Sequence, residues 1–213
     1  MRVSPFVLPN IIWLGGSPCA GKCSIADSLA EEYGFTVYRC DEAYVQHAEQ
    51  IDPVRQPVWA RLNSLDCDGL WMRPVDQQVT EKIAFYREEF PMILDDLARY
   101  PADQTVIAEG AALLPELIDE FIAAPRRAVW IVPTAEFQLT HYARRAWTAN
   151  NLAGCTDRDA AWRNWMERDI GFARHVAHTA AALNFPLLTV DGSRSLEANI
   201  LAVTRRLKLT PNY

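Results

Sequence analysis

Short apolar runs alternate along the chain with segments in which apolar residues recur at helical spacing. Continuous apolar runs that end at polar or turn-forming residues are typical of strands buried on both faces of a parallel sheet. The pattern predicts five such strands, over Asn10–Leu14, Phe35–Cys40, Gln104–Ala108, Arg127–Val132 and Pro186–Val190.

The segments between these runs predict helices. From Lys22 to Tyr33 the apolar positions follow the helical period, and Gly34 is a natural residue to end that helix. Further along, Thr156-x-x-Asp159 resembles a capping box that begins a long alanine-rich helix. The other predicted helices are Glu42–Gln50, Val75–Tyr100 with a kink at Pro91, Thr134–Trp147, the long helix to about Leu183, and Leu196–Leu207.

Five strands that alternate with helices predict an α/β fold, a three-layer α/β/α sandwich around a five-stranded parallel sheet. We predict one domain over residues 1–213, with an irregular helical cap within 51–74 and a lid whose tip lies within 148–160. In such sheets ligands bind at the carboxyl ends of the strands. The residues that follow predicted strands, and that we expect to meet at this edge, are Gly16, Asp41, Glu109 and Asp191.

Composition argues against several kinds of partner and site. No apolar run approaches the roughly 20 residues that span a bilayer, so no membrane partner is expected. The formal net charge of −6 argues against a nucleic-acid partner, and nothing indicates the oligomeric state. The five cysteines form no Cys-x-x-Cys pair, so the sequence predicts neither a disulfide framework nor a zinc site and favours a reducing cytoplasm.

One glycine-rich segment carries the strongest chemical signal. Gly16-Ser17-Pro18-Cys19-Ala20-Gly21-Lys22 matches the pattern Gly-x-x-x-x-Gly-Lys, between a predicted strand and a predicted helix. Glycines let successive backbone N–H groups converge on a phosphate, the helix N-terminus favours negative charge, and Lys22 adds a mobile cation. We therefore predict that this segment binds a nucleoside triphosphate. An ordinary strand–helix turn is the alternative interpretation.

The two residues after the motif complete the predicted binding segment, and one of them is unusual. The first position normally carries Ser or Thr, whose hydroxyl binds Mg²⁺, and here it is Cys23. Magnesium prefers oxygen ligands, so a thiol is a doubtful metal ligand. Ser24 is adjacent but points about 100° further round the helix. We expect weak or water-mediated metal binding, unless waters and substrate oxygens hold the metal well enough.

At these residues the chain resembles the nucleotide- and small-molecule-kinase branch of P-loop NTPases, which includes adenylate, shikimate and chloramphenicol kinases. The resemblance implies ATP and Mg²⁺ as cofactors and a small-molecule acceptor as partner. It also implies that Asp41, after the second strand, contacts the acceptor, often as a base, and that Glu109, after the third, holds magnesium waters. The alternatives are a helix N-cap for Asp41 and a structural ion pair for Glu109.

The same resemblance implies that Tyr142–Arg174 forms a lid with arginines on both sides of its tip. Arginines that close onto a transferring phosphoryl group stabilise the charge of the transition state. Arg145 and Arg168 are the candidates for this role beside Lys22, and a solvated helix face is the alternative for each arginine.

The predicted cap is placed where such kinases often bind the acceptor. Its Arg55, Arg61 and Arg73 are candidates for holding an anionic acceptor. Its Trp59 and Trp71 either stack on a ring of the acceptor or form the small core of the cap.

Together these features predict a kinase that transfers the γ-phosphoryl group of ATP to a small-molecule hydroxyl or phosphate acceptor. The alternative is a nucleotide-binding module or a slow NTPase without a dedicated acceptor, which Cys23 at the metal position would suit.

Overall fold

The computed structural model describes residues 8, 10–121 and 127–209. It contains a five-stranded sheet in the order β2-β3-β1-β4-β5, and every neighbouring pair of strands is parallel. The predicted α/β sandwich is therefore confirmed. The strands are β1 (Asn10–Gly16), β2 (Thr36–Arg39), β3 (Thr105–Glu109), β4 (Ala128–Pro133) and β5 (Leu187–Val190).

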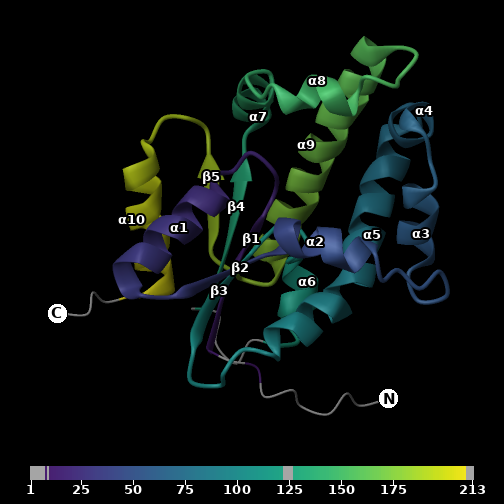
Figure 1. Ribbon diagram of the computed structural model, residues 1–213. Coiled ribbons are helices and arrows are strands. Elements are labelled where there is room, and N and C mark those ends of the chain that lie inside the picture. The colour runs from purple at the N-terminus through teal and green to yellow at the C-terminus, as the bar shows by residue number, and fades with distance from the viewer. Residues whose placement is uncertain (1–7, 9, 122–126, 210–213) are drawn as a thin grey trace.

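Helices cover both faces of the sheet because successive strand residues point to opposite sides. Ile12 and Leu14 of β1 pack in one core cluster with helices α1 (Lys22–Tyr33) and α10 (Leu196–Leu207). Their neighbours Ile11 and Trp13 belong to a second cluster. In that cluster the sheet packs against α5 (Val75–Leu97) and α9 (Arg158–Ala182), on the other side of the sheet in Figure 1.

The helix boundaries follow the predicted ones most closely where a glycine or a serine caps the helix. The bounds of α1 and α10 are those predicted, with Gly34 in a left-handed conformation after α1 and Ser195 capping α10. The long lid helix α9 is capped by Asp157, whose side chain accepts a hydrogen bond from the Ala160 amide, so the predicted Thr156 capping box is displaced by one residue.

The remaining helices are short and build the cap, the lid and one connection. The predicted helix from Thr134 ends at Tyr142 rather than Trp147, and a separate short helix follows it. Pro91 lies within α5, which continues past it to Leu97. These short helices are α2 (Cys40–Ala48), α3 (Pro57–Asn63), α4 (Cys67–Trp71), α6 (Pro115–Ile118), α7 (Ala135–Tyr142) and α8 (Trp147–Asn151).

The cap and the tip of the lid are joined covalently. Cys67 of α4 and Cys155 of the lid tip form a disulfide with their Cα atoms 5.0 Å apart, so the interpretation that excluded disulfides is wrong for this pair. The two cysteines are 88 residues apart in sequence, and only the packing of the cap on the lid brings them together. Nearby, the indole ring of Trp71 stacks on that of Trp165 with ring centroids 4.8 Å apart. The pair also removes the cysteine-based argument for a reducing compartment.

No helix in the described ranges combines the length and the apolar character that crossing a membrane requires.

Candidate functional site

The glycine-rich turn begins where the central strand β1 meets its neighbour β4. The Ser17 amide donates a hydrogen bond of 3.1 Å to the Ile131 carbonyl oxygen of β4. Gly16 has φ 136°, and a Cβ atom at this position would overlap the same carbonyl. Only glycine therefore lets the chain approach β4 this closely and turn away from the sheet.

The turn is curled rather than extended. Cys19 and Gly21 both adopt left-handed conformations, with φ of 63° and 78°. Left-handed residues within a tight turn bring neighbouring amides to the same side and create a concave site for an anion. Within the part of the chain that the structure describes, the amides of Cys19, Ala20 and Gly21 donate no hydrogen bond. The turn therefore has the shape that the motif predicts, while its binding role stays a prediction.

Lys22 lies over this turn. Its side chain is 7% exposed, and its amino group donates a hydrogen bond of 2.9 Å to the Ser17 carbonyl oxygen. This bond uses one of the three N–H donors of the ammonium group, so two donors remain for a ligand. An anion held by the turn would lie within reach of Lys22.

The predicted metal residues Glu109 and Cys23 lie side by side at the same edge. Burial raises the pKa of the Cys23 thiol to about 11, and Glu109, which repels the thiolate and accepts a hydrogen bond from the thiol, contributes to that shift. Burial also raises the pKa of Glu109, against the charge of Lys22. Cys23 is thus a neutral thiol at neutral pH, which makes it a poor magnesium ligand. Among the described residues no group of three or more His, Cys, Asp or Glu side chains is arranged to hold a metal ion.

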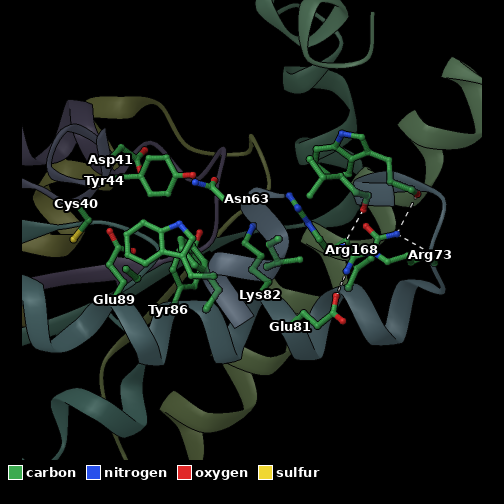
Figure 2. Close-up of a pocket in the computed structure, with 17 residues that line it drawn as sticks. Cys40, Asp41, Tyr44, Asn63, Arg73, Glu81, Lys82, Tyr86, Glu89 and Arg168 are labelled. Atoms are coloured by element: carbon green, nitrogen blue, oxygen red, sulfur yellow. Dashed lines mark hydrogen bonds and ion pairs between the residues drawn. The ribbon is translucent and has the colours of Figure 1, made fainter. Parts of the chain in front are cut away.

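Asp41 lies close to these residues, and its charge raises the pKa of both Cys23 and Glu109. Its side chain is exposed and lines a pocket. The interpretation of Asp41 as a helix N-cap is wrong: α2 begins at Cys40, and the N-cap position is held by Arg39. Among the described residues, the Asp41 carboxylate has no hydrogen bond or ion pair, and it lies at one end of the pocket (Figure 2).

This pocket has a volume of about 370 Å³, within the usual range for small-molecule sites. It lies between α5, the cap helices and α9, and Figure 2 shows Asp41 and Tyr44 at one end with Arg73 and Arg168 at the other. Aromatic rings form part of its lining, and polar side chains lie at both ends and, with Asn63 and Lys82, between them (Figure 2). The aromatic residues that line it are Tyr44, Trp59, Trp71, Phe85 and Tyr86.

Of the cap residues predicted to meet an acceptor, only some line this pocket. Arg73, Trp59 and Trp71 do. Trp59 is 1% exposed and packs between Tyr44 and Phe85, so it also forms part of the small core that was the alternative for the cap tryptophans. Arg61 does not line the pocket and pairs with Glu81, and Arg55 is exposed and pairs with Asp52.

A buried carboxylate on the lid helix organises the wall of the pocket that lies next to the glycine-rich turn. Asp169 is fully buried and pairs with Lys82 (2.7 Å) and Arg168 (2.8 Å). It also accepts hydrogen bonds from the Tyr142 hydroxyl and the Trp165 indole. Its backbone carbonyl lies 3.5 Å from the Ser17 hydroxyl of the turn, so α9 connects the turn to the pocket.

The two lid arginines singled out from the sequence take different places. Arg168 lines the pocket, held by Asp169, with its guanidinium group 4.6 Å from the centre of the Trp71 ring. Arg145 is exposed and packs on the rings of Tyr142 and Trp147. Burial raises the pKa of Cys19, and the charge of Arg145 lowers it in part, which places Arg145 beside the glycine-rich turn.

A second buried carboxylate lines the opposite end of the pocket. Glu89 is 1% exposed, and His47 lies 3.2 Å from it through Nδ1 and 2.9 Å from Asp96 through Nε2. Burial alone would lower the pKa of His47, but the hydrogen bonds and charges of these two carboxylates raise it overall. Burial raises the pKa of Glu89, and the hydrogen bond and charge of His47 oppose that shift.

Sequence reasoning missed Lys82, Glu89 and Asp169, although a signal for them exists. Asp169 falls at helical spacing between Trp165, Phe172 and Val176, on the apolar face of α9. Lys82 and Glu89 interrupt the apolar face of α5 in the same way. Ionisable residues on a buried helix face need partners, and such positions mark a buried polar cluster.

The fold and the site together define a three-layer α/β protein with a curled glycine turn and an aromatic pocket at one edge of its parallel sheet. The sequence matches no protein-family model and no curated protein.

Two solved structures resemble the chain over nearly its whole length. A protein from Chloroflexus aurantiacus J-10-fl, described as a "putative kinase", is 16% identical, with 93% of this chain and 98% of that chain covered and a TM-score of 0.41. TT1252 from Thermus thermophilus is also 16% identical, with 95% and 99% covered and a TM-score of 0.49. At these values the likenesses carry no information about binding or activity.

Proposed function

We propose that the chain is an ATP-dependent kinase that transfers a γ-phosphoryl group to a hydroxyl or phosphate of a small acceptor. The observation that carries this proposal is the adjacency of two sites. The curled turn with Lys22 and the pocket lined by Asp41 lie next to each other at one edge of the sheet, and Asp169 links them. Its carbonyl oxygen lies near the Ser17 hydroxyl, and its carboxylate pairs with Lys82 and Arg168, which line the pocket. Phosphoryl transfer needs this arrangement, because the phosphate donor and the acceptor must be held in line.

The proposal assigns a role to each candidate residue. The turn and helix start of residues 16–24 hold the phosphates, through the unbonded amides of Cys19, Ala20 and Gly21 and the Lys22 ammonium group, and Arg145 approaches them from the lid. Asp41 orients the acceptor hydroxyl and takes its proton. Glu109 would hold Mg²⁺ through waters, since the Cys23 thiol is a poor ligand, and the metal would supply positive charge beside the phosphates. The partners are a nucleoside triphosphate and a small molecule, and the proposed location is cytoplasmic.

The test is acceptor-dependent release of ADP. The purified chain is incubated with ATP and Mg²⁺ and a panel of nucleosides, sugars, aminoglycosides and aromatic alcohols, and ADP is followed with a coupled assay. We expect at least one acceptor to raise the rate at least tenfold above the rate with water alone. The Asp41→Asn variant should lose this increase and keep its affinity for ATP. If every panel member leaves the rate at the water level while ATP binds tightly, the nucleotide-binding module becomes the better description.

The second candidate function, a slow NTPase or binding module, is favoured by Cys23, because a thiol at the metal position binds Mg²⁺ poorly. A substitution at Cys23 tests it. Replacing Cys23 with serine restores a hydroxyl ligand beside Glu109, so we expect Mg²⁺-dependent ATP affinity to rise about three- to tenfold. Isothermal titration with and without the metal measures the change, and Cys40→Ser, at a buried free cysteine, is the control. An unchanged metal dependence in Cys23→Ser would show that the thiol does not limit metal binding.

A further inference from the structure

The pocket is elongated, and its two ends differ in charge. Its floor is one face of α5, from which residues at helical spacing point into it, including Lys82, Phe85 and Glu89. Lys82 and Glu89 are seven residues apart, roughly 10 Å along the helix axis. In Figure 2, Asp41 and Glu89 lie at one end of the pocket and Arg73 at the other. A ligand that fills it therefore meets carboxylates at one end and cations at the other.

The cationic end carries more positive charge than its own carboxylates balance. Glu81 accepts ion pairs from Arg61 and Arg73. Asp169 accepts ion pairs from Lys82 and Arg168. Three of these cations, Arg73, Lys82 and Arg168, line the pocket and face the two carboxylates Glu81 and Asp169, one of which is shared with Arg61 outside the pocket. This leaves an excess of at least one positive charge at this end.

These cations repel one another, and the repulsion adds to the effect of burial on their pKa values. Burial lowers the pKa of Lys82 to about 8, and the charge of Arg168 lowers it further, against the attraction of Asp169. Burial likewise lowers the pKa of Arg73, with Arg61 and Arg168 adding to the shift and Glu81 opposing it. An anion bound between these groups would relieve the repulsion.

Arg73 has unused donors at this end. Its terminal nitrogens bond to Glu81 and to the Leu70 carbonyl oxygen, which uses two of the five N–H groups of the guanidinium group, and its enclosed Nε–H has no hydrogen-bond partner among the described residues. Arg168 presents the edge of a guanidinium group whose face lies on the Trp71 ring. The planar fork of an arginine is suited to carboxylate, phosphate and sulfonate oxygens.

The part of the pocket next to Asp41 has a flat aromatic surface (Figure 2). Tyr44 stacks on Trp59 with centroids 5.4 Å apart and an interplanar angle of 21°. Phe85 meets both rings edge-on, at angles of 78° and 80°. Tyr44 is 37% exposed, so its ring is accessible to a ligand. A flat ring is the shape that packs against such a surface.

We infer that the acceptor is a flat ring compound with an attached anionic group, its ring against Tyr44 and Phe85 and its anion against Arg73 and Arg168. This inference builds on the proposed function and specifies its acceptor. The group that receives the phosphoryl lies at the other end, beside Asp41. Arg168 then serves to bind the acceptor rather than the triphosphate.

The test uses two dyes that share one ring system and differ in a single anion. The dyes 8-anilinonaphthalene-1-sulfonate and N-phenyl-1-naphthylamine both become fluorescent in apolar sites, and only the first carries a sulfonate. We expect the sulfonate dye to bind the full chain at least tenfold more tightly than the neutral dye. Arg73→Met should remove most of that preference and leave the affinity for the neutral dye within about twofold. Tyr44→Ala should weaken both dyes together.

Arg55→Met is the matched control, because this cap arginine is exposed and outside the pocket. Equal affinity for the two dyes in the unmodified chain overturns the inference, and so does an Arg73→Met variant that keeps the full preference for the sulfonate. Failure of the proposed function has a different signature. In that case ATP would not bind, as calorimetry would show, while the dye preference and its loss in Arg73→Met would remain.

Discussion

Replacing Asp169 with asparagine should lower the free energy of unfolding by about 3–5 kcal/mol, because it leaves Lys82 and Arg168, which are largely shielded from solvent, without a counter-charge. Asparagine keeps the size of the side chain, so the loss reports the charge and not a cavity. Urea unfolding at pH 7, followed by circular dichroism, measures the change. The exposed Glu167 on the same helix offers the control, since Glu167→Gln should stay within about 0.5 kcal/mol of the parent.

Asp169 also makes the free energy of unfolding depend on pH. Burial alone would raise the pKa of Asp169, but the charges of Arg168 and Lys82 and its hydrogen bonds hold that pKa well below its ordinary value. The stability that ionised Asp169 contributes is therefore complete above the ordinary aspartate pKa, and it is lost as the pH falls toward the lower folded value. The parent should lose stability over this acid range more steeply than Asp169→Asn. Equal pH profiles, or a cost no larger than that of Glu167→Gln, would contradict the structural role.

A double-mutant cycle measures the interaction energy between Lys82 and Asp169. If Lys82 and Asp169 stabilise each other, Lys82→Met combined with Asp169→Asn should cost less than the sum of the two single changes. The expected coupling reflects the uncompensated buried charge that each single change leaves behind. Additive costs would show that the two groups act independently.

Local signals in the sequence predicted the frame of the fold. The bounds of α1 and α10 follow from apolar spacing and the residues that cap them, and the strands follow from short apolar runs between turns. The order of the strands in the sheet, and the helix α6 between β3 and β4, were not predicted. Both depend on packing against the rest of the chain, which local spacing does not record.

In the candidate site, too, local structure was predictable from the sequence and long-range contacts were not. The glycine-rich turn is a local structure, so its seven residues sufficed to predict its curled shape. The pair Cys67–Cys155 and the partners of Asp169 join segments that are distant in sequence. Their pairing depends on how the cap meets the lid. An acidic residue on the apolar face of α9 indicates that some partner exists, but it does not say which residue that is.

These long-range contacts also bear on how the site can move. A lid that closes over a substrate needs a tip that is free to swing. Here the tip is tied to the cap by the Cys67–Cys155 disulfide and by the hydrogen bond from the Thr156 amide to Asp68. Cap and lid are therefore expected to move as one body relative to the sheet while the disulfide is intact.

Replacing Lys22 with alanine should weaken the binding of ATP about a hundredfold, which corresponds to about 2.7 kcal/mol. The reason is the position of the lysine. Its ammonium group lies over the curled turn with one carbonyl partner, and the amides of the turn cannot supply a full positive charge to the outer phosphates. Isothermal titration with a non-hydrolysable ATP analogue measures the affinity.

Lys208→Ala is the matched control, because this lysine is exposed after α10 and distant in sequence from the turn. It should bind the analogue as tightly as the parent. A thermal melt of Lys22→Ala separates a lost ligand contact from a lost fold, since Lys22 also bonds to the Ser17 carbonyl oxygen. If the folded Lys22→Ala variant binds the analogue with unchanged affinity, the turn does not hold the triphosphate, and the kinase proposal fails with it. If Lys22→Ala alone weakens binding of the analogue, the phosphates bind at the carboxyl end of β1, next to the pocket where the acceptor is proposed to bind.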